Sequence, residues 1–306
     1  MVSKMVYAYA AIQHLGYDRS TVDLAEELGV SRFMVGRMIK RARDDGLIEI
    51  TPRLPDPIDP QLSQALAAAY GLNVAIVVVS PTQDDVHVRT IISTAAAHLL
   101  ADLIDEDDIV GLGPGRTILQ SCERLESTAH CDVVQLTGGA AAEPEEHLSA
   151  IMRLSSVAKG RMFALHAPFL ATNERSWTAI TGEPDVRKAL SRMDRVDKAV
   201  LTVGGWPDSS LLASQLEELG EIDTLQAQGV VAEFGTTLLD ADGQEVRSLD
   251  RRLIGISSEQ LRRVPLKIAL GGGEGKTRAV IAALRSGLVD IMVTDEATAR
   301  AAIDAR

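Results

Sequence analysis

Short apolar segments alternate with longer amphipathic ones from residue 73 to residue 303, and few folds accommodate that order. Residues 73–79 form a near-continuous apolar run, of the kind that is buried on both faces of a parallel sheet. Strands are predicted at 73–79, 108–112, 132–136, 162–165, 199–203, 266–270 and 289–293, and helices at 61–70, 86–103, 117–125, 147–158, 185–193, 276–285 and 296–303. The alternation predicts a doubly wound α/β sheet, in which ligands bind at the carboxyl ends of the strands.

The length and composition of the chain favour two domains and a sizeable core. Of 306 residues, 46% are hydrophobic but only 3% aromatic, so the core is expected to consist of Ala, Val, Leu and Ile. No apolar run approaches the roughly 20 residues of a membrane-spanning helix, and no signal-peptide pattern opens the chain. The two cysteines, Cys122 and Cys131, are not marked as a metal pair. We therefore expect a cytoplasmic protein with no cofactor and no metal.

Two short helices near the start of the chain have the signature of a helix-turn-helix. The first spans residues 20–28 and begins with Ser20 in a partial capping box. Gly29 can adopt the left-handed backbone of a turn, and Ser31 can cap the second helix. The small residue Ala25, the turn glycine and two apolar anchors in the second helix follow the spacing of DNA-binding helix-turn-helix motifs.

The second of these helices, residues 31–43, contains five basic side chains and no acidic one. Its apolar positions recur at three- and four-residue steps and are predicted to form a single buried face: Val35, Met38, Ile39 and Ala42. A solvated charged surface helix is the alternative, and the preceding helix favours DNA binding. The residues expected to contact DNA are Ser31, Arg32, Phe33, Gly36, Arg37, Lys40, Arg41 and Arg43.

A supporting helix is predicted at residues 4–15, with Met5, Tyr9 and Ile12 turned inward. Gly46 is predicted to end the recognition helix, and residues 47–50 to form a short strand that would act as a wing.

A proline-rich segment then marks the domain boundary, because four prolines lie between residues 52 and 60 and make a semi-rigid spacer. We predict a DNA-binding domain at 1–51, a linker at 52–60 and an effector and oligomerisation domain at 61–306.

The charge of the chain is divided unequally between these parts. Residues 1–53 carry eight Lys or Arg and seven Asp or Glu, a net charge of +1, whereas the whole chain carries −12. The remaining residues therefore carry −13. An acidic body repels phosphates, so affinity for DNA must come from the local basic face.

Two glycine-rich turns join a predicted strand to a predicted helix and are candidate anion sites. The first, Gly-Leu-Gly-Pro-Gly-Arg-Thr at 111–117, would bind through Gly113, Gly115, Arg116 and Thr117. It matches neither a dinucleotide fingerprint nor a Walker loop. The second, at 271–276, includes Gly272, Gly273 and Lys276, and a lysine in the first turn of a helix is unfavourable unless an anion lies there. The alternative for the first turn is a tight strand-to-helix turn, and the alternative for the second is a glycine turn with a solvated lysine.

These motifs resemble those of SorC-type sugar-responsive transcriptional regulators, which are close to the DeoR regulators in their effector domain. The strongest block is residues 269–302, and the other matching stretches are 111–117, 167–169 and 240–243. The resemblance implies an effector domain related to ribose-phosphate and glucosamine-phosphate isomerases. It implies that the first turn and Lys276 hold a sugar or sugar phosphate and that Glu233 accepts a sugar hydroxyl. Pro114 departs from the more flexible residues that are common inside this loop in the family. It also removes one backbone N–H donor from the loop.

Taken together, these features predict a DNA-binding regulator, dimeric or tetrameric, that is controlled by a sugar effector and is not an enzyme. The alternatives are an active sugar-phosphate isomerase or deaminase with an appended DNA-binding domain, and a constitutive DNA-binding protein. No catalytic residue is assigned, because no convincing acid–base relay follows the phosphate loop. Asp85 with His87, and Glu146 with His147, are weak candidates for acid–base pairs.

Overall fold

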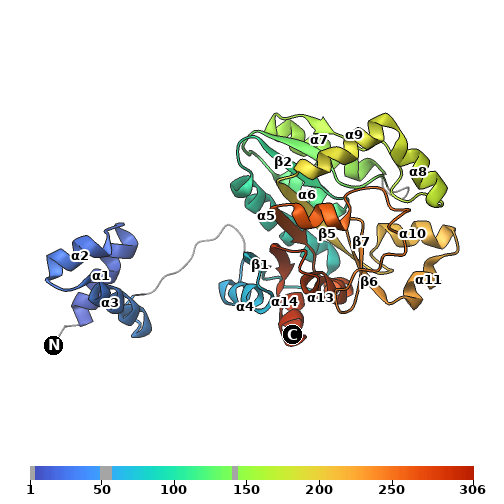
Figure 1. The fold of residues 1–306 in the computed structure, drawn as a ribbon. Coiled ribbons are helices and arrows are strands. Elements are labelled where there is room, and N and C mark those ends of the chain that lie inside the picture. Colours follow the sequence, from blue (N-terminus) through green and yellow to red (C-terminus); the bar gives the residue numbers. More distant parts are fainter. Residues whose placement is uncertain (1–3, 49–56, 140–143) are drawn as a thin grey trace. The chain divides into compact units, whose positions relative to one another are not determined.

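A computed structural model describes residues 4–48, 57–139 and 144–306, except for the side chains of residues 144–147. The chain divides into two compact units, Met1–Pro55 and Asp56–Arg306, which we describe separately (Figure 1). The boundary lies inside the predicted linker, most of which falls outside the described residues.

Residues 4–48 of the first unit form three helices, α1 (Lys4–Gly16), α2 (Thr21–Leu28) and α3 (Arg32–Asp44). The predicted caps are confirmed: the Ser20 hydroxyl accepts a hydrogen bond from Asp23 N, and the Ser31 hydroxyl accepts one from Met34 N. Gly29 has the left-handed φ of +66° that turns the chain between α2 and α3. The predicted apolar face of α3 is buried, and the core of the unit consists of Ala10, Ala11, Leu24, Ala25, Val35, Met38, Ile39 and Ala42.

The prediction that Met5, Tyr9 and Ile12 are buried is wrong, because their exposed fractions are 80%, 38% and 48%. The buried face of α1 is formed instead by Ala10 and Ala11, whose small side chains allow a close helix contact. The predicted wing could not be placed, since residues 49–50 lie outside the described part.

The second unit is built around a twisted sheet with the strand order β1-β9-β8-β5-β2-β3-β4, in which all neighbours are parallel. The strands are β1 (Val74–Val78), β2 (Asp108–Leu112), β3 (Cys131–Gln135), β4 (Met162–Phe163), β5 (Lys198–Gly205), β8 (Leu266–Leu270) and β9 (Ile291–Asp295). An antiparallel hairpin, β6 (Val230–Phe234) and β7 (Thr237–Asp240), extends from the end of β5.

Helices cover both faces of the sheet, as a doubly wound fold requires. One face packs against α4 (Pro60–Tyr70), α9 (Pro184–Arg192), α13 (Thr277–Arg285) and α14 (Glu296–Asp304). The other packs against α5 (Asp85–Leu103), α6 (Arg116–Arg124) and α7 (Pro144–Ala158). A third cluster joins the hairpin to α10 (Leu211–Glu218) and α11 (Ile222–Ala227), which stand beside it in Figure 1.

The predicted strands and helices of this unit are found within a few residues of their predicted ends, with one exception of consequence. Lys276 does not lie in the first turn of a helix. It ends a short 3₁₀ turn (Glu274–Lys276) and precedes α13. The hairpin and the helices α8 (Glu174–Gly182), α10, α11 and α12 (Ser258–Arg263) were not predicted.

Candidate effector pocket and DNA-binding helix

A pocket of about 290 Å³ lies at the carboxyl ends of β2, β5 and β8, the edge at which ligands bind in doubly wound sheets. Its walls come from the turn before α6, the start of α5, the turn before α13 and the segment between β5 and α10. Both glycine-rich turns identified in the sequence therefore open into one cavity.

One side of the pocket is suited to an anion. Helix α6 begins after Gly115, which provides no side-chain cap, so the first N–H groups of the helix remain available to a ligand. Arg116 and Thr117 line the pocket beside this helix start, and Arg89 reaches it from α5. The backbone of Gly115 has a φ of +132°, and an added Cβ would lie 2.7 Å from the Thr202 hydroxyl oxygen, so glycine is required there.

Lys276 lies deeper in the same pocket. Burial lowers the pKa of its ammonium group, and the neighbouring cations Arg89 and Arg116 lower it further, while Glu233 opposes the shift. A buried group surrounded by like charges is favoured in its charged form when an anion binds beside it. Lys276 is thus placed to bind a phosphate or another oxyanion together with the two arginines.

The same pocket also contains a buried carboxylate. Glu233, on β6, is 8% exposed and accepts hydrogen bonds from the Ser210 hydroxyl at 2.6 Å and Leu211 N at 3.2 Å. Burial raises the pKa of this carboxyl group, whereas these hydrogen bonds and Lys276 act in the other direction. Glu233 can reach this position because Gly204 faces it: a Cβ at residue 204 would lie 2.4 Å from Glu233 Cγ. A fixed carboxylate of this kind accepts hydrogen bonds from ligand hydroxyls.

The DNA-binding candidate residues form a separate exposed surface on α3. Arg32, Phe33, Gly36 and Arg37 are exposed, as are Ser31, Lys40, Arg41 and Arg43. Phe33 is 70% exposed, with the Arg32 guanidinium 5.0 Å from its ring centroid. The one acidic partner that the described residues give these cations is Asp45, whose carboxylate lies 3.9 Å from Arg41 Nε. The surface is therefore largely free to meet phosphates and base edges.

A family model described as "Putative sugar-binding domain" matches residues 59–304. The chain belongs to the SorC-type family of sugar-binding transcriptional regulators. Over 295 residues it is 30% identical to the uncharacterized transcriptional regulator YjhU of Escherichia coli (strain K12), covering 92% of this chain and 89% of that protein. It is 26% identical to the deoxyribonucleoside regulator of Bacillus subtilis (strain 168), covering 94% and 93%.

Solved structures share the fold of this SorC-type regulator. The full-length sorbitol operon regulator SorC of Klebsiella pneumoniae superposes with a TM-score of 0.71 at 21% identity, covering 98% of this chain and 99% of that one. A domain of a sugar-binding transcriptional regulator from Arthrobacter aurescens TC1 gives a TM-score of 0.72 at 25% identity, covering 83% and 100%. Among the described helices of the SorC-type chain, none is long and apolar enough to cross a membrane.

Most of the effector residues proposed from the sequence meet in the pocket: Gly115, Arg116, Thr117, Glu233, Gly272 and Lys276. Gly113 and Gly273 do not line it. Gly113 faces Leu201, and Gly273 N donates a hydrogen bond of 2.7 Å to the buried carboxylate of Asp295. These two glycines shape the turns.

The sequence reasoning missed the residues that enter the pocket from segments without a recognised motif. They are Asp85, Arg89, Ile92, Thr202, Gly204, Asp208, Ser209, Ser210, Leu211 and Ser214. Their common signal is position: each lies near the carboxyl end of a strand or in the first turns of the next helix.

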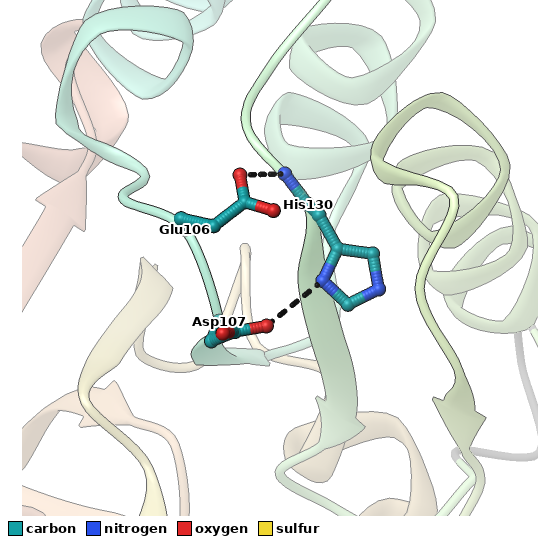
Figure 2. Close-up of side chains that lie close together, drawn as sticks. All are labelled: Glu106, Asp107 and His130. Atoms are coloured by element: carbon teal, nitrogen blue, oxygen red, sulfur yellow. Dashed lines mark hydrogen bonds and ion pairs between the residues drawn. The ribbon is translucent and has the colours of Figure 1, made fainter.

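The remaining candidates for chemistry are not assembled into an acid–base pair. Asp85 lines the pocket, but no histidine does so among the described residues, His87 included. The side chains of residues 145–147 are outside the described part. Trp206 packs in the apolar cluster beside the hairpin. The described residues contain one group of three potential metal ligands, Glu106, Asp107 and His130 (Figure 2), and none of them lines the pocket.

Proposed function

We propose that this SorC-type regulator binds operator DNA through α3 and that a sugar or sugar phosphate, bound between Lys276 and Glu233, controls its DNA binding. The observation that carries the proposal is a single pocket lined by three cations and a helix start together with a buried carboxylate and several hydroxyl groups; Asp85 and Asp208 also line it. The cations and the helix start suit a phosphate, and the carboxylates and hydroxyl groups suit sugar hydroxyls.

The regulator is further proposed to act in the cytoplasm as a homo-dimer or homo-tetramer without catalytic activity. One short basic helix offers few phosphate contacts, and pairing two copies on adjacent half-sites doubles that number. The relatives are named as transcriptional regulators, which supports a regulatory role for the pocket. Effector binding would then alter the spacing between recognition helices in the oligomer.

The DNA part of the proposal is tested with Arg37→Ala. Arg37 is exposed on α3, so the change leaves the core of the unit intact. A lost base or phosphate contact costs roughly 1–3 kcal/mol of DNA binding. Lys4→Ala is the matched control, because it removes one exposed cation from α1 of the same unit. Equal operator affinity for Arg37→Ala and the native protein would refute the assignment of α3 as the DNA-contacting helix. An equal loss in Arg37→Ala and Lys4→Ala would mean that the effect comes only from the net charge of the unit.

The effector part is tested by a thermal-shift screen with free and phosphorylated sugars and polyols, followed by DNA binding with each hit. Lys276→Gln is expected to abolish the effect of the hit on DNA binding while leaving DNA binding itself intact. A response that survives this change would exclude Lys276 from the site. Purified protein that converts ribose, glucosamine or fructose phosphates would overturn the non-enzymatic role.

A further inference from the structure

A second cavity, of about 400 Å³, lies at the edge of the sheet opposite the effector pocket. It is formed where β2, β3 and β4 begin, and the end of α9 with the following 3₁₀ turn (Met193–Arg195) completes it. Ile109, Val134 and Phe163 give it an apolar surface, and Arg161, Arg192 and Arg195 contribute cations. The function proposed above does not use this cavity.

Two of its arginines are held in place by neighbours. The Arg192 guanidinium lies 4.0 Å from the ring centroid of Phe163, and the Arg161 guanidinium lies 5.5 Å from it. Arg161 also forms an ion pair of 2.7 Å with Asp132. A guanidinium that lies over an aromatic ring keeps its N–H edge available, and the fixed fork suits the two oxygens of a carboxylate or phosphate.

The charges around the cavity leave two cations without an acidic partner. Its two lining carboxylates are engaged, Asp132 with Arg161 and Asp107 with the His130 ring, at 3.3 Å between Oδ1 and Nδ1 (Figure 2). Asp194, which lies between Arg192 and Arg195 in the sequence, pairs with Arg263 at 2.9 Å. Within the described ranges, no ion pair is formed by Arg192 or by Arg195.

The acidic part of the chain contains both paired and unpaired arginines. Several exposed arginines there have a carboxylate within 4.0 Å, including Arg247, Arg251 and Arg300. Arg89 and Arg116, which line the effector pocket, form no ion pair with the described residues. Arg192 and Arg195 share two features with Arg89 and Arg116: they form no ion pair with the described residues, and they line a cavity.

The carboxylates beside this cavity are not suited to binding a metal ion. Glu106, Asp107 and His130 have ligand atoms within 4.8 Å of one another, but all three side chains are exposed. Asp107 and His130 share the cavity with three arginines, which oppose the approach of a metal ion.

We propose that this cavity is a second ligand site, which binds the phosphate or carboxylate group of a small organic molecule through Arg192 and Arg195. The apolar part of the ligand lies on Ile109, Val134 and Phe163. Because β2 runs from this cavity to the effector pocket, the regulator has one site at each edge of the same sheet.

The test uses the full chain with Lys276→Gln, so that the effector pocket is disabled, and titrates phenyl phosphate and benzoate while observing arginine side-chain Nε–Hε signals. Signals removed by Arg192→Gln and Arg195→Gln are expected to shift saturably with at least one ligand. The double variant Arg192→Gln/Arg195→Gln should bind at least tenfold more weakly, a difference of about 1.4 kcal/mol. Tighter binding of phenyl phosphate identifies a phosphate site, and tighter binding of benzoate identifies a carboxylate site.

Lys188→Gln is the matched control, because it removes an exposed cation from the same helix outside the cavity. Its affinity should equal that of the parent. The proposal is overturned if neither ligand gives a saturable shift, if sodium chloride at matched ionic strength reproduces the shift, or if the control loses as much affinity as the double variant.

Discussion

Gly204→Ala tests the structural basis of the hydroxyl-binding side of the pocket without removing any polar group. The added Cβ would lie 2.4 Å from Glu233 Cγ and 2.8 Å from Glu233 Oε1. Carbon atoms pack at about 3.5–4.0 Å, so the glutamate side chain must retreat by roughly 1 Å. It is buried and already hydrogen-bonded to Ser210 and Leu211, so it has no room to move without weakening those bonds.

The size of the effect follows from these contacts. Overpacking a dense interior costs about 1–3 kcal/mol, and a hydrogen bond to a charged group contributes about 1.5–3 kcal/mol. We expect Gly204→Ala to lower the free energy of unfolding of the effector unit by about 3 kcal/mol, which corresponds to a decrease in Tm of about 6–12 °C for a unit of this size. Calorimetry without ligand measures this change, and the effector-induced shift in Tm should also shrink.

Gly205→Ala is the comparison, because the two residues are adjacent on β5. A Cβ at residue 205 would lie 3.2 Å from Gly275 O and 3.6 Å from Lys276 Cγ, a tight but tolerable fit. This variant should lose about 1 kcal/mol or less. Equal Tm values for the two variants, or an unchanged effector response in Gly204→Ala, would refute the argument that Glu233 is positioned by the missing side chain at 204.

Three further changes probe other parts of the molecule. Gly36 lies at an exposed helical position with nothing within 4 Å of an added Cβ, so Gly36→Ala should raise the stability of the DNA-binding unit by about 1 kcal/mol. The same change should weaken operator binding. Undiminished binding would exclude close approach of the helix to DNA as the reason for the glycine. Effector affinity should fall as pH rises through the lowered pKa of Lys276, because the anion favours the protonated amine, and Lys276→Gln should remove this slope in a calorimetric titration. Asp295→Ala removes a fully buried carboxylate that accepts hydrogen bonds from Gly273 N and from Thr298 N and Oγ1. The midpoint of urea unfolding should therefore fall by the equivalent of about 3 kcal/mol. An unchanged midpoint would contradict a stabilising role for this carboxylate.

The parts of the fold that could be predicted were those governed by local rules. Ser20, Gly29 and Ser31 fix the helix-turn-helix through caps and a left-handed turn, which depend on near neighbours in sequence. The parallel strands were predictable because each is a short apolar run, and strand 266–270 was placed to the residue. The β6–β7 hairpin was not predicted, because it stands outside the alternation of strands and helices and pairs only with the end of β5 and with itself.

The residues of the candidate site were also predicted where local sequence rules apply and missed where they do not. Glycine turns that precede helices are visible in the sequence, so Gly115, Arg116 and Lys276 were found. Arg89, Asp208 and Ser210 were not, because they reach the pocket only when the sheet brings distant segments together. The errors in α1 arose because the apolar pattern of that helix does not show which stripe is buried. Small alanines at residues 10 and 11 gave the closer contact, and larger side chains remained exposed.

The alanine-rich core of the first unit affects how operator occupancy responds to heat. Among the described residues, that core has eight buried side chains, and four of them are alanine: Ala10, Ala11, Ala25 and Ala42. So little apolar area gives a domain of about 50 residues a small margin of stability by itself. Contact with DNA therefore contributes to keeping this unit folded, since a ligand that binds only the native state stabilises it. We expect the small DNA-binding unit to melt at a lower temperature than the sheet unit, and its melting to set the temperature at which the regulator leaves its operator.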